Sequence, residues 1–350
     1  MQNWPGVIEA YREQLDLPSG VSAITLLEGN THLLPVPRLA RELGAASLHV
    51  KYEGLNPTGS FKDRGMTVAV SEAAHRGAKT VICASTGNTA ASAAAYAARG
   101  GLRCLVIIPE GAVASGKLAG ARAYGAEVLQ IEGSFDAALD LVRQATERLP
   151  LTLVNSINPY RLQGQKTVAF EIGDALDGAP DWLALPVGNA GNISAIWMGW
   201  QELERERGWT PPHFLGVQAA GAAPLVQGRS IKNPETVASA IRIGQPARGE
   251  QALAAARDSG GKIVAVDDDQ ILAAQQSLAQ EGIWVEPASA AGLAGLLAER
   301  QAGRLQLGGK DVVCICTGHG LKDPAAIDKH YPQPKRIAAE PGALEEELRT

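Results

Sequence analysis

The stretch Asn56-Pro57-Thr58-Gly59-Ser60-Phe61-Lys62-Asp63-Arg64-Gly65-Met66 is the point around which the chain is organised. Its first four residues predict a turn, because proline fixes φ and glycine permits positive φ. Ser60 is then placed to cap a helix that runs through Ala73. Lys62 falls in the first helical turn, where the positive end of the helix dipole disfavours a cation. A lysine with a neutral amine suits covalent catalysis, but an isolated lysine is usually a solvated surface residue, so the rest of the chain must decide.

Length and composition limit the class of protein to which the chain can belong. A chain of 350 residues exceeds a comfortable single core and favours two domains. Its net charge of −5, with both signs interspersed, argues against a nucleic-acid surface. The start lacks the basic and apolar regions of a signal peptide, and no apolar run approaches the length of a membrane span. We therefore expect a cytoplasmic protein with neither a nucleic-acid nor a membrane partner.

The four cysteines, Cys83, Cys104, Cys314 and Cys316, each lie within an apolar, strand-like run. Cys314 and Cys316 would alternate faces of one strand, so they would hardly chelate a metal together. We expect buried thiols in a reducing compartment, and no metal site.

Short apolar runs alternate with longer helical patterns along the chain. The runs are Leu48–Tyr52, Thr80–Ser85, Cys104–Pro109, Glu127–Ile131, Leu151–Asn155, Trp182–Val187, Phe214–Ala219, Lys262–Val266 and Val312–Cys316. Continuous apolar strands separated by helices predict an α/β fold with parallel-dominated open sheets flanked by helices. So many strands favour two domains with a seam near residue 155, and ligands gather at the strand C-termini. The polar residues 341–350 predict a peripheral tail.

Two of these strands lead into small and polar residues. One is followed by Ser85-Thr86-Gly87-Asn88-Thr89, and the other by Gly188-Asn189-Ala190-Gly191-Asn192. Small residues let a ligand approach the backbone, and the second turn presents N–H groups to an anion at a helix N-terminus. A single phosphate fits better than a pyrophosphate, because the G-x-G-x-x-G spacing is absent. Taken singly, each turn is also consistent with an ordinary capped helix start or a tight glycine turn.

Two further strand ends carry a cation. Gly111–Lys117 nearly spells a nucleotide-phosphate loop, but Leu118 replaces the hydroxyl that would hold Mg²⁺, which disfavours a nucleotidase. Lys117 still sits at a helix start, where an anion can bind. The strand that ends in Asn155-Ser156 is followed by Arg161, whose guanidinium can fork onto a phosphate or a carboxylate. An isolated arginine would more often be a surface charge or a structural ion pair.

The last strand ends in Thr317, whose hydroxyl can bond a ring nitrogen or cap the following helix. His319 has no acidic or serine partner in a triad pattern, so we expect a loop histidine. We expect Glu53, Asp63 and Glu286 to be structural rather than a hydrolytic pair.

Together these motifs resemble the pyridoxal-phosphate enzymes of the tryptophan-synthase-β type, also called fold type II. The resemblance implies that Lys62 is the Schiff-base lysine and that Asn88 lies beside the cofactor's phenolic oxygen. It implies that Gly188–Asn192 cups the cofactor phosphate and that Thr317 meets the pyridine nitrogen.

The resemblance covers nearly the whole chain, because it extends to Glu28–Leu33 and to Ser239–Pro246. One departure is His32, where the family usually has proline. It implies a small domain of residues 55–155 and a large domain of residues 1–54 plus 156–340, with pyridoxal 5'-phosphate in the cleft between them.

The resemblance also implies conversion of O-phospho-L-homoserine and water to L-threonine and phosphate, the last step of threonine biosynthesis, by a homodimer of this chain. The substrate phosphate would occupy a second anion site, and small polar side chains would complete the substrate site. The residues assigned to the substrate are Ser85, Thr86, Thr89, Lys117, Asn155, Ser156 and Arg161.

Two alternatives remain. A serine/threonine dehydratase or a β-replacing synthase would share the fold, but such enzymes typically carry a more glycine-rich phosphate loop and need no second phosphate site. A non-catalytic ligand-binding module would also share the fold, but an intact Lys62 counts against it.

Overall fold

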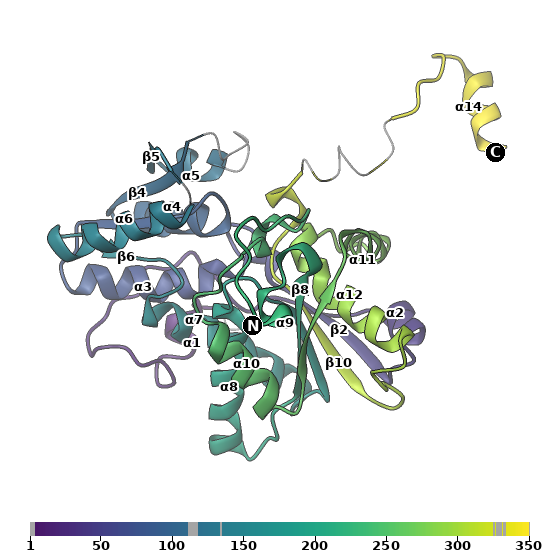
Figure 1. Ribbon diagram of the computed structural model, residues 1–350, viewed down its shortest axis with the longest axis horizontal. Coiled ribbons are helices and arrows are strands. Elements are labelled where there is room, and N and C mark those ends of the chain that lie inside the picture. The colour runs from purple at the N-terminus through teal and green to yellow at the C-terminus, as the bar shows by residue number, and fades with distance from the viewer. Residues whose placement is uncertain are drawn as a thin grey trace.

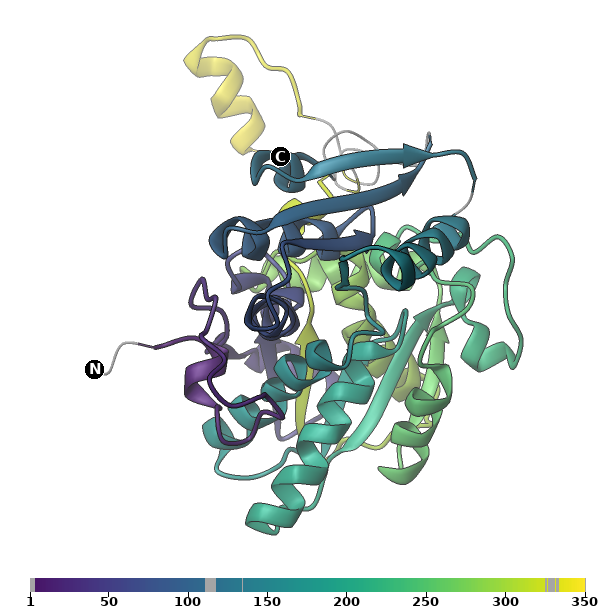
Figure 2. The same ribbon diagram turned by 90° about the vertical axis from the view of Figure 1, so that its left-hand side faces the viewer.

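The computed structural model describes residues 4–110, 118–133, 135–324, 326, 331 and 334–349. These residues form two open sheets with helices packed against them, in two lobes that Figures 1 and 2 show from two sides. The larger sheet has the order β1-β2-β10-β7-β8-β9 and is parallel apart from the pairing of β1 with β2. Its strands are β1 (Leu33–Pro35), β2 (Ser47–Tyr52), β7 (Trp182–Pro186), β8 (His213–Ala219), β9 (Lys262–Val266) and β10 (Asp311–Cys316).

The smaller sheet has the order β5-β4-β3-β6 and is parallel throughout its described strands. Its strands are β3 (Thr80–Ala84), β4 (Arg103–Pro109), β5 (Glu127–Ile131) and β6 (Thr152–Leu153). All of them lie between residues 80 and 153, which supports a division of the chain near residue 155. The domain bounds themselves stay a prediction.

Helices cover the sheets because nearly every connection between parallel strands must cross from one end of the sheet to the other. The helices are α1 (Val7–Ala10), α2 (Pro37–Leu43), α3 (Lys62–His75), α4 (Asn88–Arg99), α5 (Ala119–Ala123), α6 (Phe135–Arg148), α7 (Pro159–Leu176), α8 (Gly191–Arg207), α9 (Pro224–Gln227), α10 (Gly249–Asp258), α11 (Asp268–Gln280), α12 (Pro287–Gln301) and α14 (Pro341–Leu348). The alanine-rich α4 is buried along most of its length, and so is α12, which packs against β7, β8 and β10.

Helices α3 and α7 cross in direct backbone contact, and two glycines make this possible. A Cβ atom at Gly164 would lie 1.8 Å from the carbonyl oxygen of Arg64, and one at Gly65 would lie 2.6 Å from that of Arg161. No larger residue fits either position without moving a helix. The crossing brings the start of α7, which carries Arg161, close to the start of α3, which carries Lys62.

The α/β class and the parallel-dominated sheets are confirmed, and each predicted apolar run overlaps a strand. The run Leu151–Asn155 yields only β6, because the side chain of Asn155 pairs with the backbone of Ala84 through both amide atoms, at 2.9 and 2.8 Å. The short antiparallel β1 was not predicted as a strand. Three residues at a sheet edge are too few to produce a recognisable alternation.

The predicted capping role of Ser60 is wrong. Helix α3 begins at Lys62 after Phe61 without a side-chain cap, and the Ser60 hydroxyl is buried with no hydrogen-bond partner among the described residues. The Ser60 carbonyl, by contrast, accepts a hydrogen bond from the backbone N–H of Asp63 at 3.3 Å. Ser60 therefore meets the helix start through its backbone and not through its hydroxyl.

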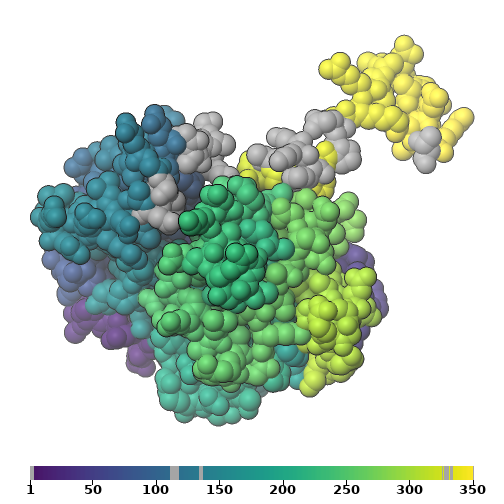
Figure 3. Space-filling view, viewed as in Figure 1, coloured from purple at the N-terminus to yellow at the C-terminus, as the bar shows by residue number. Residues whose placement is uncertain are grey.

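The C-terminal segment forms α14, whose residues are largely exposed and which stands apart from the body of the molecule in Figures 1 and 3. None of the described helices has both the length and the apolar character needed to cross a bilayer.

Candidate active site

Three helices of the candidate site begin at residues that the sequence singled out. Helix α3 begins at Lys62, α4 at Asn88 and α8 at Gly191. Helices α4 and α8 follow the C-terminal ends of β3 and β7, which is where ligands bind in open parallel sheets.

The turn before Lys62 is hydrogen-bonded to the residues that follow β10. The backbone N–H of Phe61 donates to the carbonyl oxygen of Thr317 at 3.0 Å, and that of His319 donates to Gly59 at 2.9 Å. Two segments more than 250 residues apart in sequence thus run side by side. These backbone hydrogen bonds hold the start of α3, and with it Lys62, next to Thr317.

Lys62 is half-buried, and its Nζ lies 4.2 Å from the centre of the Phe61 ring. Burial lowers the pKa of Lys62 to about 7, the charge of Arg161 adds to the lowering, and Glu286 opposes it. Near neutral pH a large share of this amine is therefore unprotonated, which is the form that attacks a carbonyl carbon.

The residues after β3 line the site from the smaller sheet. Ser85, Thr86 and Thr89 are half-buried, and the Ser85 hydroxyl accepts a weak hydrogen bond from the Gly87 N–H at 3.3 Å. The Asn88 amide nitrogen donates to both carboxylate oxygens of Glu286, at 3.0 and 3.2 Å.

The loop Gly188–Asn192 forms a cradle at the start of α8. Ala190 adopts a left-handed conformation with φ of 64°, and both polar atoms of the buried Asn192 amide lack a hydrogen-bond partner among the described residues. A Cβ atom at Gly191 would have no neighbour nearer than 3.8 Å, whereas one at Gly188 would come within 3.0 Å of Ile241. Room, unpaired polar atoms and a positive helix end together suit a phosphate group.

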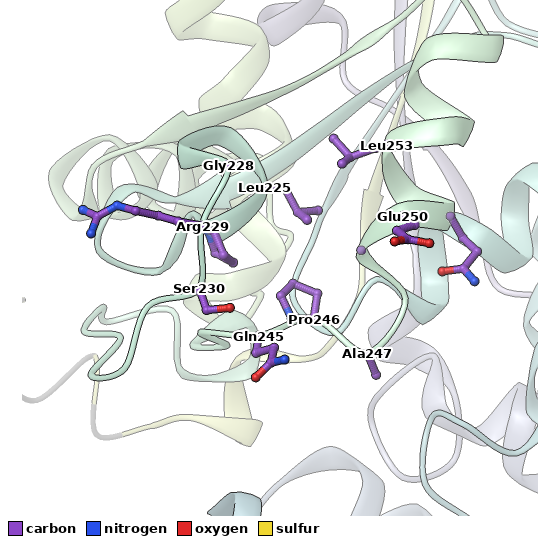
Figure 4. Close-up of a pocket in the computed structure, with 12 residues that line it drawn as sticks. Leu225, Gly228, Arg229, Ser230, Gln245, Pro246, Ala247, Glu250 and Leu253 are labelled. Atoms are coloured by element: carbon purple, nitrogen blue, oxygen red, sulfur yellow. The ribbon is translucent and has the colours of Figure 1, made fainter.

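The Asn189 side chain is engaged with a neighbouring segment. Its side-chain oxygen accepts from the backbone N–H of Ala247 at 3.0 Å and so fixes the segment 245–250 against the cradle. This segment borders a surface hollow of ≈ 550 Å³, and Figure 4 shows Gln245, Pro246 and Ala247 among the residues that line it.

Thr317 lies 2.9 Å from Ser289 through their hydroxyl oxygens, and it is buried. Ser289 also accepts from the backbone N–H of Gly318 at 2.8 Å. The sequence analysis missed Ser289, although its place after Glu286 and Pro287 at a helix start was a usable signal. A hydroxyl pair of this kind is neutral and either donates to or accepts from a ring nitrogen.

The proposed second anion site is only partly open to a ligand. Arg161 is fully buried, its Nη1 donates to the carbonyl oxygen of Val154 at 3.2 Å, and its Nε and Nη2 have no hydrogen-bond partner in the part of the chain that the structure describes. Burial lowers the pKa of Arg161 to about 10, so it stays charged at neutral pH. The Asn155 amide is occupied by the backbone of Ala84 and is not free for a substrate.

Ser156 places this site next to the cradle, because a Cβ atom at Gly191 would lie 3.8 Å from its Cβ. The Ser156 carbonyl accepts from Nε of Arg248 at 3.4 Å, so a second arginine that the sequence analysis missed lies nearby. Lys117 lies outside the described residues.

Beneath the site, four buried charges balance one another. Arg64 donates to Glu53 and to Glu171, and Lys51 also donates to Glu171, each over 2.6 Å. Burial alone would raise the pKa of Glu171, but the charges of Arg64 and Lys51 lower it to about 2. The expectation that Glu53 is structural agrees with this network, and Asp63, which accepts from Thr58 and Ser92, has a similar structural role.

The chain matches the model of the family described as "Pyridoxal-phosphate dependent enzyme" over residues 24–318. It belongs to this family and is a pyridoxal-phosphate dependent enzyme of fold type II. The Lys62 amine, the Asn192 cradle and the buried Thr317 hydroxyl fit the aldehyde, phosphate and ring nitrogen of that cofactor.

Two curated relatives are more specific. The chain is 57% identical to a threonine synthase of Synechocystis, over 92% of this chain and 84% of the relative. It is 56% identical to a threonine synthase of Halalkalibacterium halodurans, over 93% and 91% respectively. Its fold is similar to the structure of threonine deaminase isoform 2 from Solanum lycopersicum, with a TM-score of 0.74, 23% identity and 92% of both chains covered.

Proposed function

We propose that this enzyme converts O-phospho-L-homoserine and water to L-threonine and phosphate, as a threonine synthase. The observation that carries the proposal is the Arg161 guanidinium, which is buried near Lys62 with two nitrogens that no described residue pairs. A buried cation without a partner is costly unless a ligand supplies the opposite charge. The cradle at Gly188–Asn192 takes the cofactor phosphate, so Arg161 is left for a second phosphate. Only a phosphoester substrate brings one.

When bound, the cofactor acts as an electron sink that acidifies the carbon–hydrogen bonds of the amino-acid substrate. Lys62 would hold the cofactor covalently through Nζ. As a free amine, it would take and return protons on the substrate carbons, for which a pKa of about 7 is well matched to neutral pH. This role needs the half-buried position at the start of α3, where the cationic form is disfavoured.

Other residues of the site would bind the cofactor and orient it. Backbone N–H groups of Gly188–Asn192 would hold the cofactor phosphate at the positive end of α8, and an Asn88 N–H would bond its phenolic oxygen. The Thr317 hydroxyl would bond the pyridine nitrogen without protonating it. A neutral hydroxyl there leaves the ring nitrogen largely unprotonated.

The remaining side chains are assigned to the substrate. Arg161, with Lys117 and Ser156, would bind its phosphate, and Ser85, Thr86 and Thr89 would contact its amino-acid end. Asn155 would support the substrate site without touching the substrate, because both polar atoms of its side-chain amide are already hydrogen-bonded to the backbone of Ala84.

The test is phosphate release from O-phospho-L-homoserine, set beside turnover of O-acetylserine and of serine by the same holoenzyme. We expect threonine and phosphate in equal amounts and little reaction with the other two. Lys62→Ala should abolish turnover and the borohydride-reducible attachment of the cofactor. Faster reaction with serine than with O-phospho-L-homoserine would overturn the proposal in favour of a dehydratase.

We also propose that the chain works as a homodimer in the cytoplasm, with the two domains bounded as predicted. Four buried, unpaired cysteines are consistent with a reducing compartment. Light scattering of the purified holoenzyme measures the mass directly, and a monomer at micromolar concentration would contradict the dimer.

A further inference from the structure

Glu286 is a buried carboxylate in an unusual setting. It directly precedes α12, is 3% exposed, and among the described residues its oxygens accept hydrogen bonds only from the Asn88 amide nitrogen. Across the described residues, it takes part in no ion pair, whereas the buried Glu53 and Glu171 share Arg64. A buried carboxylate with one amide partner costs stability, so packing alone does not account for it.

The Asn88–Glu286 contact joins the two sheets. Asn88 begins α4 after β3 of the smaller sheet, and Glu286 precedes α12, which packs on β7, β8 and β10 of the larger one. The backbone N–H of Glu286 donates to the Gly318 carbonyl at 3.1 Å. A Cβ atom at Gly318 would lie only 2.4 Å from Glu286 Oε1, so the carboxylate fills the room that this glycine leaves beside Thr317.

The carboxylate also fixes the orientation of the Asn88 amide. An ionised carboxylate only accepts hydrogen bonds, so the NH₂ group must face it and the amide oxygen must face away. A single N–H directed between the two carboxylate oxygens accounts for both contacts, so the NH₂ group has a second N–H to offer to a ligand. Without Glu286 the amide would be free to turn over and present its oxygen instead.

Charged groups of two segments, the start of α3 and residues 322–323, act on the carboxylate. Burial raises the pKa of Glu286 to about 7; the charges of Lys322 and Lys62 and the Asn88 hydrogen bond oppose this rise, and Asp323 adds to it. Lys322 also donates to the carbonyl oxygen of Thr58, in the turn before Lys62, at 3.0 Å. The group is thus placed among the elements that carry the site.

We propose that Glu286 is a positioning residue of the active site: by holding the Asn88 amide from across the two sheets, it aims one N–H at the phenolic oxygen of the bound cofactor. The proposal rests on the proposed function in one respect, the placing of Asn88 beside the cofactor.

The experiment compares Glu286→Gln with Glu286→Ala in the wild-type and in the Asn88→Ala background. Both substitutions remove the charge, but only glutamine keeps an oxygen that accepts from Asn88. Any difference between them therefore reports the hydrogen bond and not the charge. Two readouts are independent of turnover: the dissociation constant of pyridoxal phosphate, from quenching of tryptophan fluorescence, and the pH midpoint of the visible absorption of the bound cofactor.

We expect Glu286→Ala to bind the cofactor about tenfold more weakly than Glu286→Gln, the effect of losing one charge-assisted contact. Its absorption midpoint should lie at higher pH, because the phenolate loses a donor. Both differences should vanish in the Asn88→Ala background. Identical behaviour of the two variants, or a difference that persists without Asn88, would overturn the proposal.

Failure of this inference and failure of the proposed function are distinguishable. If the wild-type holoenzyme releases phosphate from O-phospho-L-homoserine while the two Glu286 variants behave alike, only the positioning role fails. If the wild-type protein does not bind pyridoxal phosphate, the assignment of the site and this inference fail together.

Discussion

At the scale of single residues, Arg161 gives the clearest test of the proposed substrate, because its buried charge needs an anionic ligand. Arg161→Ala should lower kcat/KM for O-phospho-L-homoserine by about tenfold to a thousandfold, the range for losing a buried charged contact. It should barely change the affinity or spectrum of the cofactor, because the cofactor phosphate is assigned to Gly188–Asn192. Steady-state kinetics and a cofactor titration measure the two effects separately.

Arg205→Ala is the matched control, because Arg205 is an exposed arginine in the last turn of α8. It should leave both quantities unchanged. If Arg161→Ala also leaves turnover intact, Arg161 does not bind the substrate phosphate, and the dehydratase alternative gains support.

Residue types and their order were enough to single out Lys62, Asn88 and Gly191, each of which begins a helix, but not what each side chain contacts. The amide of Asn155 suggests a ligand from its place after a strand, yet it pairs with Ala84 of the neighbouring strand. Ser289 and Glu286 are separated from Thr317 and Asn88 by 28 and 198 positions. No local pattern connects residues so far apart, so these contacts had to come from the structure.

At the scale of elements, the start of α8 provides a clean test of the phosphate cradle. Gly191→Val should weaken cofactor binding by about tenfold or more without unfolding the protein, because the added side chain enters space that is open in the protein but needed by a phosphate. Cofactor titration and urea denaturation of the apoprotein measure the two effects.

Gly188→Ala is the informative contrast. Its Cβ would press on the backbone of Ile241 at 3.0 Å, so this change should affect stability as well as binding. Unchanged cofactor affinity in a folded Gly191→Val variant would show that the loop is only a turn.

Helix α3 depends on the four-charge network beneath it. Arg64→Met removes the cation shared by Glu53 and Glu171 and leaves two buried carboxylates beside Lys51 alone. Such a change should destabilise the protein by about 3–5 kcal/mol. Urea denaturation at pH 7 measures this loss.

The control is Arg103→Ala, which removes a surface arginine paired with Glu127. Both partners are exposed, so stability should hardly change. A loss for Arg64→Met no larger than that of Arg103→Ala would mean that the buried network does not hold α3 in place.

The strand and helix pattern was predictable because buried parallel strands are continuous apolar runs. The crossing of α3 and α7 was not, because it depends on two glycines at Gly65 and Gly164 that look like ordinary helical residues in the sequence. Contact between backbones is a property of the pair of helices and leaves no signal in either one.

At the scale of the whole molecule, the two parallel-dominated sheets follow from the order of the elements. The way in which the sheets are joined does not. Asn88 and Glu286 meet from opposite sheets, and the turn at Gly59–Phe61 pairs with residues 317–319. Each of these joints consists of a few hydrogen bonds, for which sequence periodicity gives no indication.

The buried Glu286 should make the free energy of unfolding depend on pH. Its pKa is raised by burial from 4.5 to about 7 in the folded protein. A carboxyl group whose pKa is raised on folding binds its proton more tightly in the folded protein. The stability of the wild-type fold is therefore unaffected by this group below pH 4.5 and falls as the pH rises through 7, where the buried group must ionise. Glutamine does not titrate, so Glu286→Gln should gain stability relative to the wild type between pH 5 and pH 8. The gain should approach about 3 kcal/mol in the cofactor-free protein.

Urea denaturation of both proteins at several pH values measures this difference, with the exposed Glu147→Gln as the matched control. The control should show no pH-dependent gain, because an exposed carboxylate keeps its hydration in the folded state. A Glu286→Gln variant that is less stable than the wild type at pH 8 would mean that the carboxylate stabilises the fold. A gain would mean that the wild-type protein carries a destabilising group at the joint between its sheets, as expected for a residue retained for its effect on the site.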